Sequence, residues 1–365
     1  MASSAHNQQL ITNNSQLCEI SLTPPTNLPH PYPIIVGKGV LKELPEILKS
    51  KGMIDHIVVL HDQRVETIAK NVAMIVGTKN LISIPSGEKT KTLSNLENLA
   101  EKLTAIGATR STLLIAVGGG MTTDLVGFLA SIYMRGIRVI HIPTSMLGMV
   151  DAAIGGKTAV DLPGAKNILG TVHHPSAIIA DTELLASLPE QQFNEGLVEV
   201  IKKAAILDAK TFAWFEKAMP QILKRDEEAL MQCITEAARL KAEVVSEDDR
   251  DAHHRHFLNF GHTVGHAVES FSHFAISHGQ AVSIGIAIEM KIVGTKGADR
   301  VLALLHLTKM PTEIPSEYPI AALWNIMQSD KKKKDGVVRI FVPTAIGTGE
   351  ARPLTFEEFS AAAKE

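Results

Sequence analysis

The sequence predicts an α/β domain followed by an all-α domain. Its 365 residues exceed what a single hydrophobic core usually serves, so two domains are expected. In the first half, short runs of β-branched and aliphatic residues alternate with helical patterns, which is typical of a parallel sheet covered by helices. From about Leu184 onward, nearly all of the hydrophobic periodicity is helical.

The elements of the first half follow one another in regular order. Strands are expected at Tyr32–Val36, Ile57–Leu60, Leu81–Ile84, Leu113–Val117 and Val139–Ile142. Helices are expected at Val40–Leu48, Val65–Val76 and Leu93–Ile106. We therefore expect a flexible tail at 1–18, the α/β domain at 19–183 and the helical domain at 184–365, with an active site in the cleft between the two domains.

The second half contains long helical segments, such as Glu227–Ser246, and one strand-like run, Val337–Val342. No internal repeat or low-complexity linker interrupts it. The two halves are therefore expected to pack against each other.

The charge and composition argue against several classes of protein. The 36 basic and 39 acidic side chains give a net charge of −3, which offers no cationic surface for a nucleic acid. Cys18 and Cys233 form no metal or disulfide pattern, which suits a reducing compartment. The sequence has no secretory signal and no apolar run of the roughly 18 to 20 residues that cross a membrane. A cytoplasmic protein is expected.

The first candidate site follows the buried strand Leu113–Val117. Gly118, Gly119 and Gly120 lead into an apolar helix that begins near Thr122. Glycines let a backbone approach a pyrophosphate, and the first amides of a helix bind anions. The pattern is not G-x-G-x-x-G, and an ordinary strand-to-helix turn explains it equally well. Asp124 either complements the helix dipole or reaches a bound ligand.

A second candidate site lies at 150–158 and 163–167. Lys157 follows two glycines, and Lys166 also lies close to a glycine in a largely apolar region. Such lysines favour an anionic ligand, although the four-residue spacer of a Walker motif is absent. Solvated loop lysines are the equally ordinary alternative.

The third candidate is the helix around Glu199. Glu199, Lys202 and Lys203 fall within about 100° of the helix circumference, and the neighbouring positions are apolar. A solvated charged stripe is the ordinary interpretation of this pattern. A narrow charged stripe that faces an internal cleft is the alternative.

The fourth candidate is a group of histidines. His262 and His266 lie four residues apart on one helix face, and His278 precedes the apolar helical run Ala281–Met290. Thr263 occupies the place of a metalloprotease base, so the motif is not H-E-x-x-H. Together with Glu199, His262 and His278 form a ligand set suited to a catalytic metal with an open position.

Two further polar clusters have ordinary explanations. His253, His254 and His256 are expected to be surface residues. The run of four lysines at 331–334 is typical of a solvated turn, and a phosphate contact from one of them is the alternative.

Taken together, these segments resemble the 3-dehydroquinate synthases of the sugar phosphate cyclase family, over almost the whole chain after the tail. The resemblance depends on motifs that occur in the family's order: GGG…D at 118–124, Tyr-Met-Arg-Gly at 133–136, Asp151 with Gly-Gly-Lys-Thr at 155–158, Lys166-Asn167, Glu-Val-Ile-Lys at 199–202, Asn-Phe-Gly-His-Thr-Val-Gly-His at 259–266, and His278-Gly279.

The resemblance implies a Rossmann-like NAD-binding domain, a C-terminal helical domain and a homodimer. It implies conversion of 3-deoxy-D-arabino-heptulosonate 7-phosphate into 3-dehydroquinate and phosphate, a step of aromatic amino acid biosynthesis. NAD⁺ accepts a hydride and returns it within each turnover, phosphate is eliminated, and an aldol addition closes the ring. A divalent metal, Zn²⁺ or Co²⁺, acts as Lewis acid on the oxidised carbon's oxygen.

The resemblance also implies roles for individual residues. The metal ligands are Glu199, His262 and His278. The catalytic residues are Lys202, His266, Asp151 and Asp251. The substrate-binding residues are Lys157, Asn167, Lys202, Lys241, Arg255, Asn259, one lysine of the 331–334 run (Lys331 or Lys332 among them) and Arg135, the last from the neighbouring subunit. The NAD-binding residues are Asp62, Glu88, Lys91, Gly119, Gly120, Asp124, Thr144, Ser145 and Lys166.

Several positions depart from the family's usual pattern, although none of them removes a metal ligand or a substrate cation. They are Gln280 and Asp251 in place of Glu, Asp161 in place of Asn, His253 in place of Gly, Gln63-Arg64 after Asp62, and Thr122-Thr123 before Asp124. A sister cyclase, a metal-dependent polyol dehydrogenase and a non-catalytic binding protein are the competing hypotheses. Gly-Gly-Lys-Thr, Asn259 and His266 favour dehydroquinate formation over the first.

Overall fold

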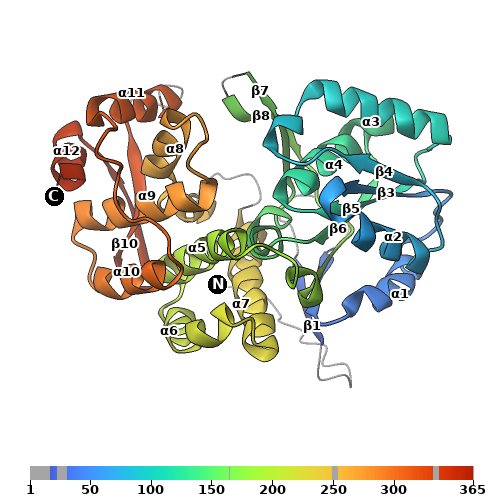
Figure 1. Cartoon of the computed structure of the whole chain (residues 1–365), viewed down its shortest axis with the longest axis horizontal. Helices are drawn as coiled ribbons and strands as arrows, with labels where there is room; N and C mark the ends of the chain where they lie inside the picture. Colours follow the sequence, from blue (N-terminus) through green and yellow to red (C-terminus); the bar gives the residue numbers. More distant parts are fainter. Residues whose placement is uncertain (1–16, 23–30, 164, 249–253, 332–336, 365) are drawn as a thin grey trace, which may run out of the picture. The chain divides into compact units, whose positions relative to one another are not determined.

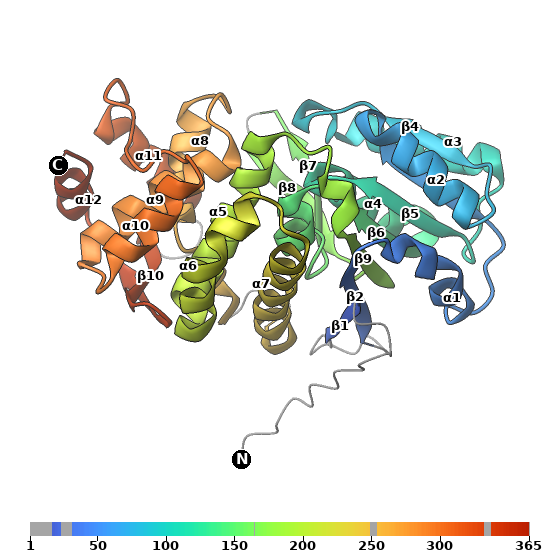
Figure 2. The ribbon, with the colours of Figure 1, turned by 60° about the horizontal axis from the view of Figure 1, so that its bottom comes forward.

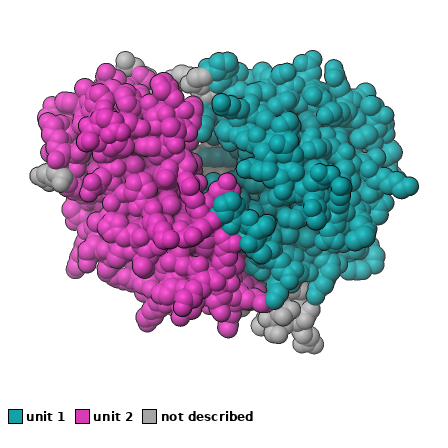
Figure 3. Space-filling model, viewed as in Figure 1, with its two compact units in different colours: residues 1–189, 241–246 teal, residues 190–240, 247–365 magenta. Residues whose placement is uncertain are grey.

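The computed structural model describes residues 17–22, 31–163, 165–248, 254–331 and 337–364. The chain divides into two compact units, one made of residues 1–189 and 241–246 and the other of residues 190–240 and 247–365 (Figure 3). The domain boundary expected after residue 183 stays a prediction. The tail expected at 1–18 lies mostly outside the described residues, but Leu17 and Cys18 belong to a strand.

The first unit is built on a seven-stranded sheet in the order β1-β2-β9-β6-β5-β3-β4 (Figure 1). The pair β1–β2 is antiparallel, and the other neighbours are parallel. The strands are β1 (Leu17–Leu22), β2 (Tyr32–Gly37), β3 (Ile57–Asp62), β4 (Leu81–Ile84), β5 (Leu113–Gly118), β6 (Arg138–Pro143) and β9 (Ala177–Asp181).

Helices cover both faces of this sheet because alternate residues of its strands point to opposite sides (Figure 2). Leu114 and Ala116 of β5 pack with helices α3 and α4, whereas Leu113, Ile115 and Val117 pack with α1 and α2. These helices are α1 (Leu44–Lys49), α2 (Glu66–Ile75), α3 (Leu93–Ile106) and α4 (Gly120–Ile132). Short helical turns complete the unit: η1 (Val40–Glu43), η2 (Gln63–Val65), η3 (Glu88–Thr90), η4 (Tyr133–Arg135), η5 (Gly148–Ala152) and η6 (Thr182–Leu185).

The strand order creates a ligand-binding position at the edge of the sheet. The chain passes from β3 outward to β4, returns to β5 on the other side of β3, and then proceeds to β6 and β9. In open parallel sheets, the carboxyl ends of the strands at such a reversal form the usual ligand site. Asp62 ends β3 and the three glycines end β5, so both lie at this reversal.

The sequence predicted no strand between 157 and 172. This segment forms an antiparallel hairpin of β7 (Lys157–Leu162) and β8 (Ala165–Val172). Gly170 permits the close pairing, because a Cβ there would stand 2.1 Å from the carbonyl oxygen of Thr158. The hairpin carries Lys157, Lys166 and Asn167 on paired strands.

The second unit is mainly helical. Its helices are α5 (Glu190–Leu207), α6 (Ala209–Leu223), α7 (Glu227–Glu247), whose residues 241–246 group with the first unit, α8 (His262–Phe271), α9 (His278–Val293), α10 (Ala298–Leu307), α11 (Ile320–Lys331) and α12 (Phe356–Lys364), together with the turn η7 (His254–Asn259). No helix in the described part of the chain is long and apolar enough to cross a membrane.

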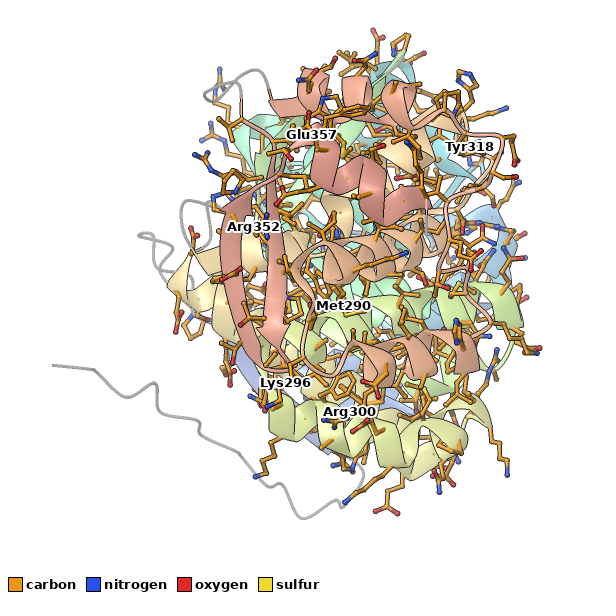
Figure 4. The ribbon with its side chains drawn as sticks, turned by 90° about the vertical axis from the view of Figure 1, so that its left-hand side faces the viewer. Met290, Lys296, Arg300, Tyr318, Arg352 and Glu357 are labelled. Carbon is orange, nitrogen blue, oxygen red and sulfur yellow. The ribbon has the colours of Figure 1, made fainter. Side chains whose placement is uncertain are left out.

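A two-stranded hairpin accompanies these helices, so the expectation of an all-α unit is incomplete. Strand β10 (Arg339–Ala345) was expected from the apolar run there, whereas its partner β11 (Thr348–Pro353) is polar and carries no strand signal. Figure 4 shows the hairpin beside α9 and α10, with Met290, Arg300 and Arg352 labelled. Lys296 bridges to Ala345 and thereby joins the segment after α9 to the hairpin.

Helices α8 and α9 approach each other so closely that glycine is required at their contact. A Cβ at Gly285 of α9 would stand 1.9 Å from the carbonyl oxygen of Gly261, just before α8. A Cβ at Gly265 would stand 2.8 Å from the carbonyl oxygen of Ala281. The obstacles are backbone atoms, which cannot rotate away as a side chain does.

Replacing Gly285 by Ala should lower the free energy of unfolding by about 3 kcal/mol, because overpacking against backbone forces the two helices apart. Gly294→Ala at the end of the same helix is the control. Gly294 has φ 65° and a Cβ there would meet no atom within 4 Å, so only the left-handed backbone costs free energy, about 1 kcal/mol. Urea unfolding of both variants measures the difference. Equal losses in the two variants would contradict the close-contact explanation.

Candidate functional site

Glu199 lies near the middle of α5, on a part of the helix that is buried all round. Glu199 is 1% exposed, Lys202 2% and Lys203 0%. The solvated charged stripe that seemed the ordinary interpretation of this helix is therefore wrong. The reason is that α5 packs against α6, α9, α10 and the β10–β11 hairpin, which leaves none of these positions facing water.

Two imidazoles face the Glu199 carboxylate. The Nε2 atoms of His262, at the start of α8, and of His278, at the start of α9, each lie 3.7 Å from Glu199 Oε1. His262 Nδ1 lies 3.1 Å from the carbonyl oxygen of Phe260, which can only accept a hydrogen bond. Nδ1 therefore carries the proton, and Nε2 keeps its lone pair toward Glu199.

His278 has a comparable partner on its far side. Its Nδ1 lies 3.5 Å from Oε2 of Glu269, a buried residue of α8. The N-terminus of α9 is further held by Ser277, whose hydroxyl donates to Glu195 of α5 at 2.7 Å. Gln280 accepts a hydrogen bond from the Ser277 amide at 3.1 Å. Gln280 thus fills the capping position that Glu would fill, which explains why this departure is tolerated.

The donor set fits a divalent metal ion. The ligand atoms of Glu199, His262 and His278 all lie within 4.8 Å of one another. Two donors that share a tetrahedral ion at 2.0–2.1 Å stand roughly 3.4 Å apart, close to the observed 3.7 Å. Both Glu199 oxygens are buried without a hydrogen bond of good geometry, although Lys202 Nζ stands 2.5 Å from Oε2. Such a carboxylate is expected to bind a cation.

Electrostatics keep this carboxylate ionised. Burial alone would raise the pKa of Glu199, but Lys202 and the two imidazoles hold it well below its usual range. Burial and the charge of Lys202 lower the pKa of His262 well below normal, which keeps that ring neutral. Burial opposes protonation of His278, but its hydrogen bonds to Glu199 and Glu269 raise its pKa to about 9. A metal at this site therefore has to displace a proton from His278.

The ring of His266 lies beside the proposed ligands on the exposed side of α8. Its centroid is 5.0 Å from that of His262 and 6.0 Å from that of His278. With Glu269 and His278 it forms a second possible ligand group among the described residues. Both groups contain His278, so His278 cannot serve as a ligand in both. The members of the second group are more exposed.

The glycine turn after β5 has the form of an anion site. Gly119 precedes α4 and provides no side-chain cap, so the first amides of this helix remain available. A Cβ at Gly119 would stand 3.3 Å from Ser145 Oγ, and one at Gly120 would stand 2.9 Å from the Ala152 Cβ. Thr144 joins this group by donating its amide to the Gly118 carbonyl at 2.9 Å. The turn thus fits the pyrophosphate of a dinucleotide.

A cluster of polar side chains around the buried Lys91 lies next to the turn. Lys91 Nζ donates to Asp124 Oδ2 at 2.6 Å and to Asn167 Oδ1 at 2.5 Å, and it lies 3.6 Å from Glu88 Oε1. Burial opposes the charge on Lys91, but Asp124 and Glu88 outweigh it and raise the pKa of Lys91. Burial raises the pKa of Asp124 to about 6, despite the opposing effect of Lys91. The structure therefore brings together four predicted residues from distant parts of the sequence.

Two other predicted carboxylates are paired with cations. Asp62 accepts hydrogen bonds from the Arg64 amide at 2.8 Å and from its guanidinium at 3.0 Å, and from Ser86. Asp151 lies 3.0 Å from Lys241 Nζ, which also donates to the Asp151 carbonyl at 2.7 Å. Arg64, a departure from the family's pattern, thus binds the acidic residue at the end of β3.

Other predicted residues lie on the β7–β8 hairpin, on η7 and on η4. Lys157 and Asn167 are exposed on the hairpin, Lys166 is half-buried there, and Asn259 is half-buried at the end of η7. Arg135 has a left-handed backbone with φ 69°. The expectations for Asp251 and Lys332, and for the side chains of Arg255 and Lys331, lie outside the described residues, as do those for His253 and His254.

Three acidic residues that support the histidines were missed in the sequence. They are Glu195, Glu269 and Glu289, whose carboxylates contact Ser277, His278 and the backbone before α8. Glu289 carried a usable signal, since it is an isolated acid near the end of an apolar helical run. The other two carried none, because acidic residues are common on amphipathic helices.

Comparison with known proteins gives consistent matches. The family model described as 3-dehydroquinate synthase N-terminal matches residues 81–195, and the one described as 3-dehydroquinate synthase C-terminal matches residues 196–333. The chain is 36% identical over 334 residues to a 3-dehydroquinate synthase of Halorhodospira halophila, covering 88% of this chain and 94% of that protein.

Two solved structures share the fold at 25% identity. One is ValA, a 2-epi-5-epi-valiolone synthase from Streptomyces hygroscopicus with NAD⁺ and Zn²⁺ bound, at a TM-score of 0.81 over 91% of this chain and 95% of that one. The other is 2-deoxy-scyllo-inosose synthase complexed with carbaglucose-6-phosphate, NAD⁺ and Co²⁺, at a TM-score of 0.80 over 95% of this chain and 99% of that one.

The raised pKa of Asp124 makes a prediction about stability. Its folded value of about 6 exceeds its ordinary value of 3.8, so the folded chain holds this proton more tightly than the unfolded chain. The protonated Asp124 carboxyl group therefore adds to the free energy of unfolding at low pH. This contribution is lost as the pH rises through about 6. Between pH 5 and pH 8 the loss should be on the order of 1 kcal/mol.

The measurement is urea unfolding of the native chain and of Asp124→Asn at both pH values. The variant should lose that much less stability over the interval, because it has no carboxyl group to titrate there. An identical pH dependence in the two proteins would show that Asp124 titrates normally.

Proposed function

The chain belongs to the 3-dehydroquinate synthase family, and on this basis we propose that it converts 3-deoxy-D-arabino-heptulosonate 7-phosphate into 3-dehydroquinate and phosphate. The observation that carries the proposal is the buried Glu199 carboxylate faced by two imidazoles, in a chain whose family matches span residues 81–333. The enzyme depends on NAD and a divalent metal, and it is a lyase of the shikimate pathway.

We assign the metal to Glu199, His262 and His278, in agreement with the Zn²⁺ and Co²⁺ of the two related structures. A divalent ion held there would polarise a substrate oxygen as a Lewis acid. Bound NAD⁺ would supply a temporary hydride acceptor. All remaining roles belong to side chains that bind, orient or exchange protons with the substrate.

Lys202 is the proposed cation beside the reacting carbon. Its Nζ is fixed between Glu199 Oε2, at 2.5 Å, and the Leu258 carbonyl, at 2.6 Å. Burial between two acceptors leaves one N–H for a substrate oxygen. We propose that Asn259, which follows Leu258, and Arg255 bind the same part of the substrate.

Proton transfer is assigned to His266, which is exposed beside the metal ligands. Asp151 and Asp251 are the proposed additional catalytic carboxylates. The Asp151–Lys241 pair supplies both an acid–base group and a cation for the substrate carboxylate.

The substrate phosphate is assigned to cationic and amide side chains. Lys157 and Asn167 are exposed residues of the β7–β8 hairpin. Lys331 or Lys332 and Arg135 complete the proposed phosphate site.

The NAD site is assigned to residues at the carboxyl edge of the sheet, where the pyrophosphate would lie on the glycine turn. The proposed members are Asp62, Glu88, Lys91, Gly119, Gly120, Asp124, Thr144, Ser145 and Lys166. The Lys91 cluster supports this assignment, because it holds the Asp124 carboxylate and the Lys91 ammonium in fixed positions beside the glycine turn.

We further propose a cytoplasmic homodimer. Ile132 and Met134, on either side of Tyr133, are 48% and 46% exposed, and Arg135 follows them in a left-handed conformation. Exposed apolar side chains beside a strained cation are typical of a subunit interface. Arg135 is proposed to reach the substrate of the partner subunit.

A sister cyclase with a different sugar phosphate is the second candidate, since both related structures above belong to such enzymes. The higher identity to the 3-dehydroquinate synthase, 36% against 25%, favours the first. A polyol dehydrogenase would accumulate NADH and would not release phosphate.

The test is incubation of the metal-loaded enzyme with the heptulosonate phosphate and substoichiometric NAD⁺. Phosphate should be released over many turnovers per NAD⁺ with no net NADH, because the hydride returns to the substrate. Glucose 6-phosphate, whose carba-analogue binds the inosose synthase, serves as the control and should release none. Phosphate release from glucose 6-phosphate alone would support the sister cyclase. Stoichiometric NADH would indicate a dehydrogenase.

A further inference from the structure

Glu289 is a fully buried carboxylate that is not one of the proposed metal ligands. It lies near the end of α9, eleven residues after His278, and is 0% exposed. Oε2 accepts a hydrogen bond from the Gly261 amide at 2.8 Å, and Oε1 accepts one from the Val264 amide at 3.1 Å. Each oxygen therefore binds a backbone donor at the start of α8.

These bonds supply a helix cap from another helix. Gly261 precedes α8 in a left-handed conformation, φ 76° and ψ −8°, and it has no side chain to cap the first turn. The Glu289 charge also lies at the positive end of the helix dipole. A charged acceptor with two backbone donors is among the stronger hydrogen-bonding arrangements in a protein interior.

The capped peptide is also the one that orients His262. The Gly261 amide held by Glu289 and the Phe260 carbonyl that faces His262 Nδ1 at 3.1 Å belong to the same planar peptide unit. Because the peptide is rigid, fixing its N–H also fixes the direction of its C=O. A continuous hydrogen-bonded chain therefore runs from Glu289, through this peptide, to the imidazole.

The close contact between α8 and α9 leaves this chain little freedom. The backbone of Gly261 touches α9 at Gly285, one turn before Glu289, where even a Cβ would collide. Turning the 260–261 peptide over would break the hydrogen bond between the Gly261 amide and Glu289 Oε2. The Phe260 carbonyl of this peptide points toward His262 Nδ1.

We propose that Glu289 is a positioning residue for His262. It fixes the 260–261 peptide so that the Phe260 carbonyl holds the proton on Nδ1 and presents the Nε2 lone pair to the metal. This inference rests on the proposed metal site. Partners that orient a ligand in this way typically contribute 10- to 100-fold to metal affinity.

The alternative is that Glu289 only stabilises the start of α8. The two roles differ in what a neutral substitution changes. In Glu289→Gln, the amide nitrogen is a donor and would oppose one of the two backbone N–H groups, and in either orientation the Gly261 amide would lose its charged acceptor, which loosens the 260–261 peptide. A positioning role predicts weaker metal binding, whereas a capping role predicts lower stability alone.

Asp208→Asn is a matched control from the same unit. Asp208 caps α6 by accepting the amides of Lys210 at 2.8 Å and Thr211 at 3.1 Å, and it contacts none of the metal-site histidines. Like Glu289→Gln, this substitution removes the charge of a capping carboxylate, here one that also pairs with Arg239 Nη2 at 3.2 Å, and α6 carries no proposed ligand. Glu289→Asp, which keeps the charge on a shorter side chain, tests rescue and serves as the test variant if Glu289→Gln does not fold.

The experiment measures Co²⁺ affinity, the visible Co²⁺ spectrum and the thermal midpoint of the metal-free full-length proteins. Glu289→Gln should weaken Co²⁺ binding by about 10- to 100-fold and alter the spectrum. Glu289→Asp should fall between it and the native chain. Asp208→Asn should lower the midpoint while its Co²⁺ affinity stays within about twofold of native.

Three results would overturn the inference. Native Co²⁺ affinity and spectrum in Glu289→Gln, or in Glu289→Asp if it alone folds, would reduce Glu289 to a cap. Equal weakening in Asp208→Asn would indicate general loosening of the unit. If the native chain itself binds no Co²⁺, the proposed metal site fails and this inference fails with it, whereas the other two results leave the metal site intact.

Discussion

The buried carboxylate of Glu199 is the constraint on which the second unit depends. An ionised group at 1% exposure is costly unless cations surround it, and Lys202 alone satisfies only one of its oxygens. Nε2 of His262 and Nε2 of His278 each lie 3.7 Å from Glu199 Oε1. The three groups surround a position that a divalent ion would fill. Burial makes the ionised carboxylate costly in free energy. The same burial would strengthen its binding of a metal ion, because no water competes for the carboxylate oxygens.

The surrounding helices hold each proposed ligand in place. Glu195 holds the start of α9 through Ser277, Glu269 faces Nδ1 of His278, and Glu289 fixes the peptide that faces Nδ1 of His262. Glycines at the α8–α9 contact bring the two histidine-bearing helix starts close enough for this to occur. In the first unit, burial raises the pKa of Asp124, whereas Asp124 and Glu88 outweigh burial and raise the pKa of Lys91.

The sequence predicted the parallel sheet and most of its strands, because those runs are continuous and aliphatic. Residue types, spacing and the family resemblance together also predicted Glu199, His262 and His278 as a ligand triad. The sequence did not predict β1 or β9, which are short, nor the β7–β8 hairpin and β11, which are polar or contain glycine. The burial of Lys202 and Lys203 could not be predicted either, since helical periodicity identifies a charged face but not what packs against it. The supporting acids were missed because only tertiary contacts distinguish them from surface residues.

The most direct test of this account is the metal content of the purified chain and of its isosteric variant Glu199→Gln after equal exposure to Zn²⁺ and removal of free metal. The native chain should retain one ion per chain, and the variant close to none, because an amide lacks the charge that binds the ion. A circular dichroism spectrum that is unchanged by the substitution would show that the fold persists. Equal retention of Zn²⁺ by the two proteins would contradict the assignment of Glu199, His262 and His278 as the metal site.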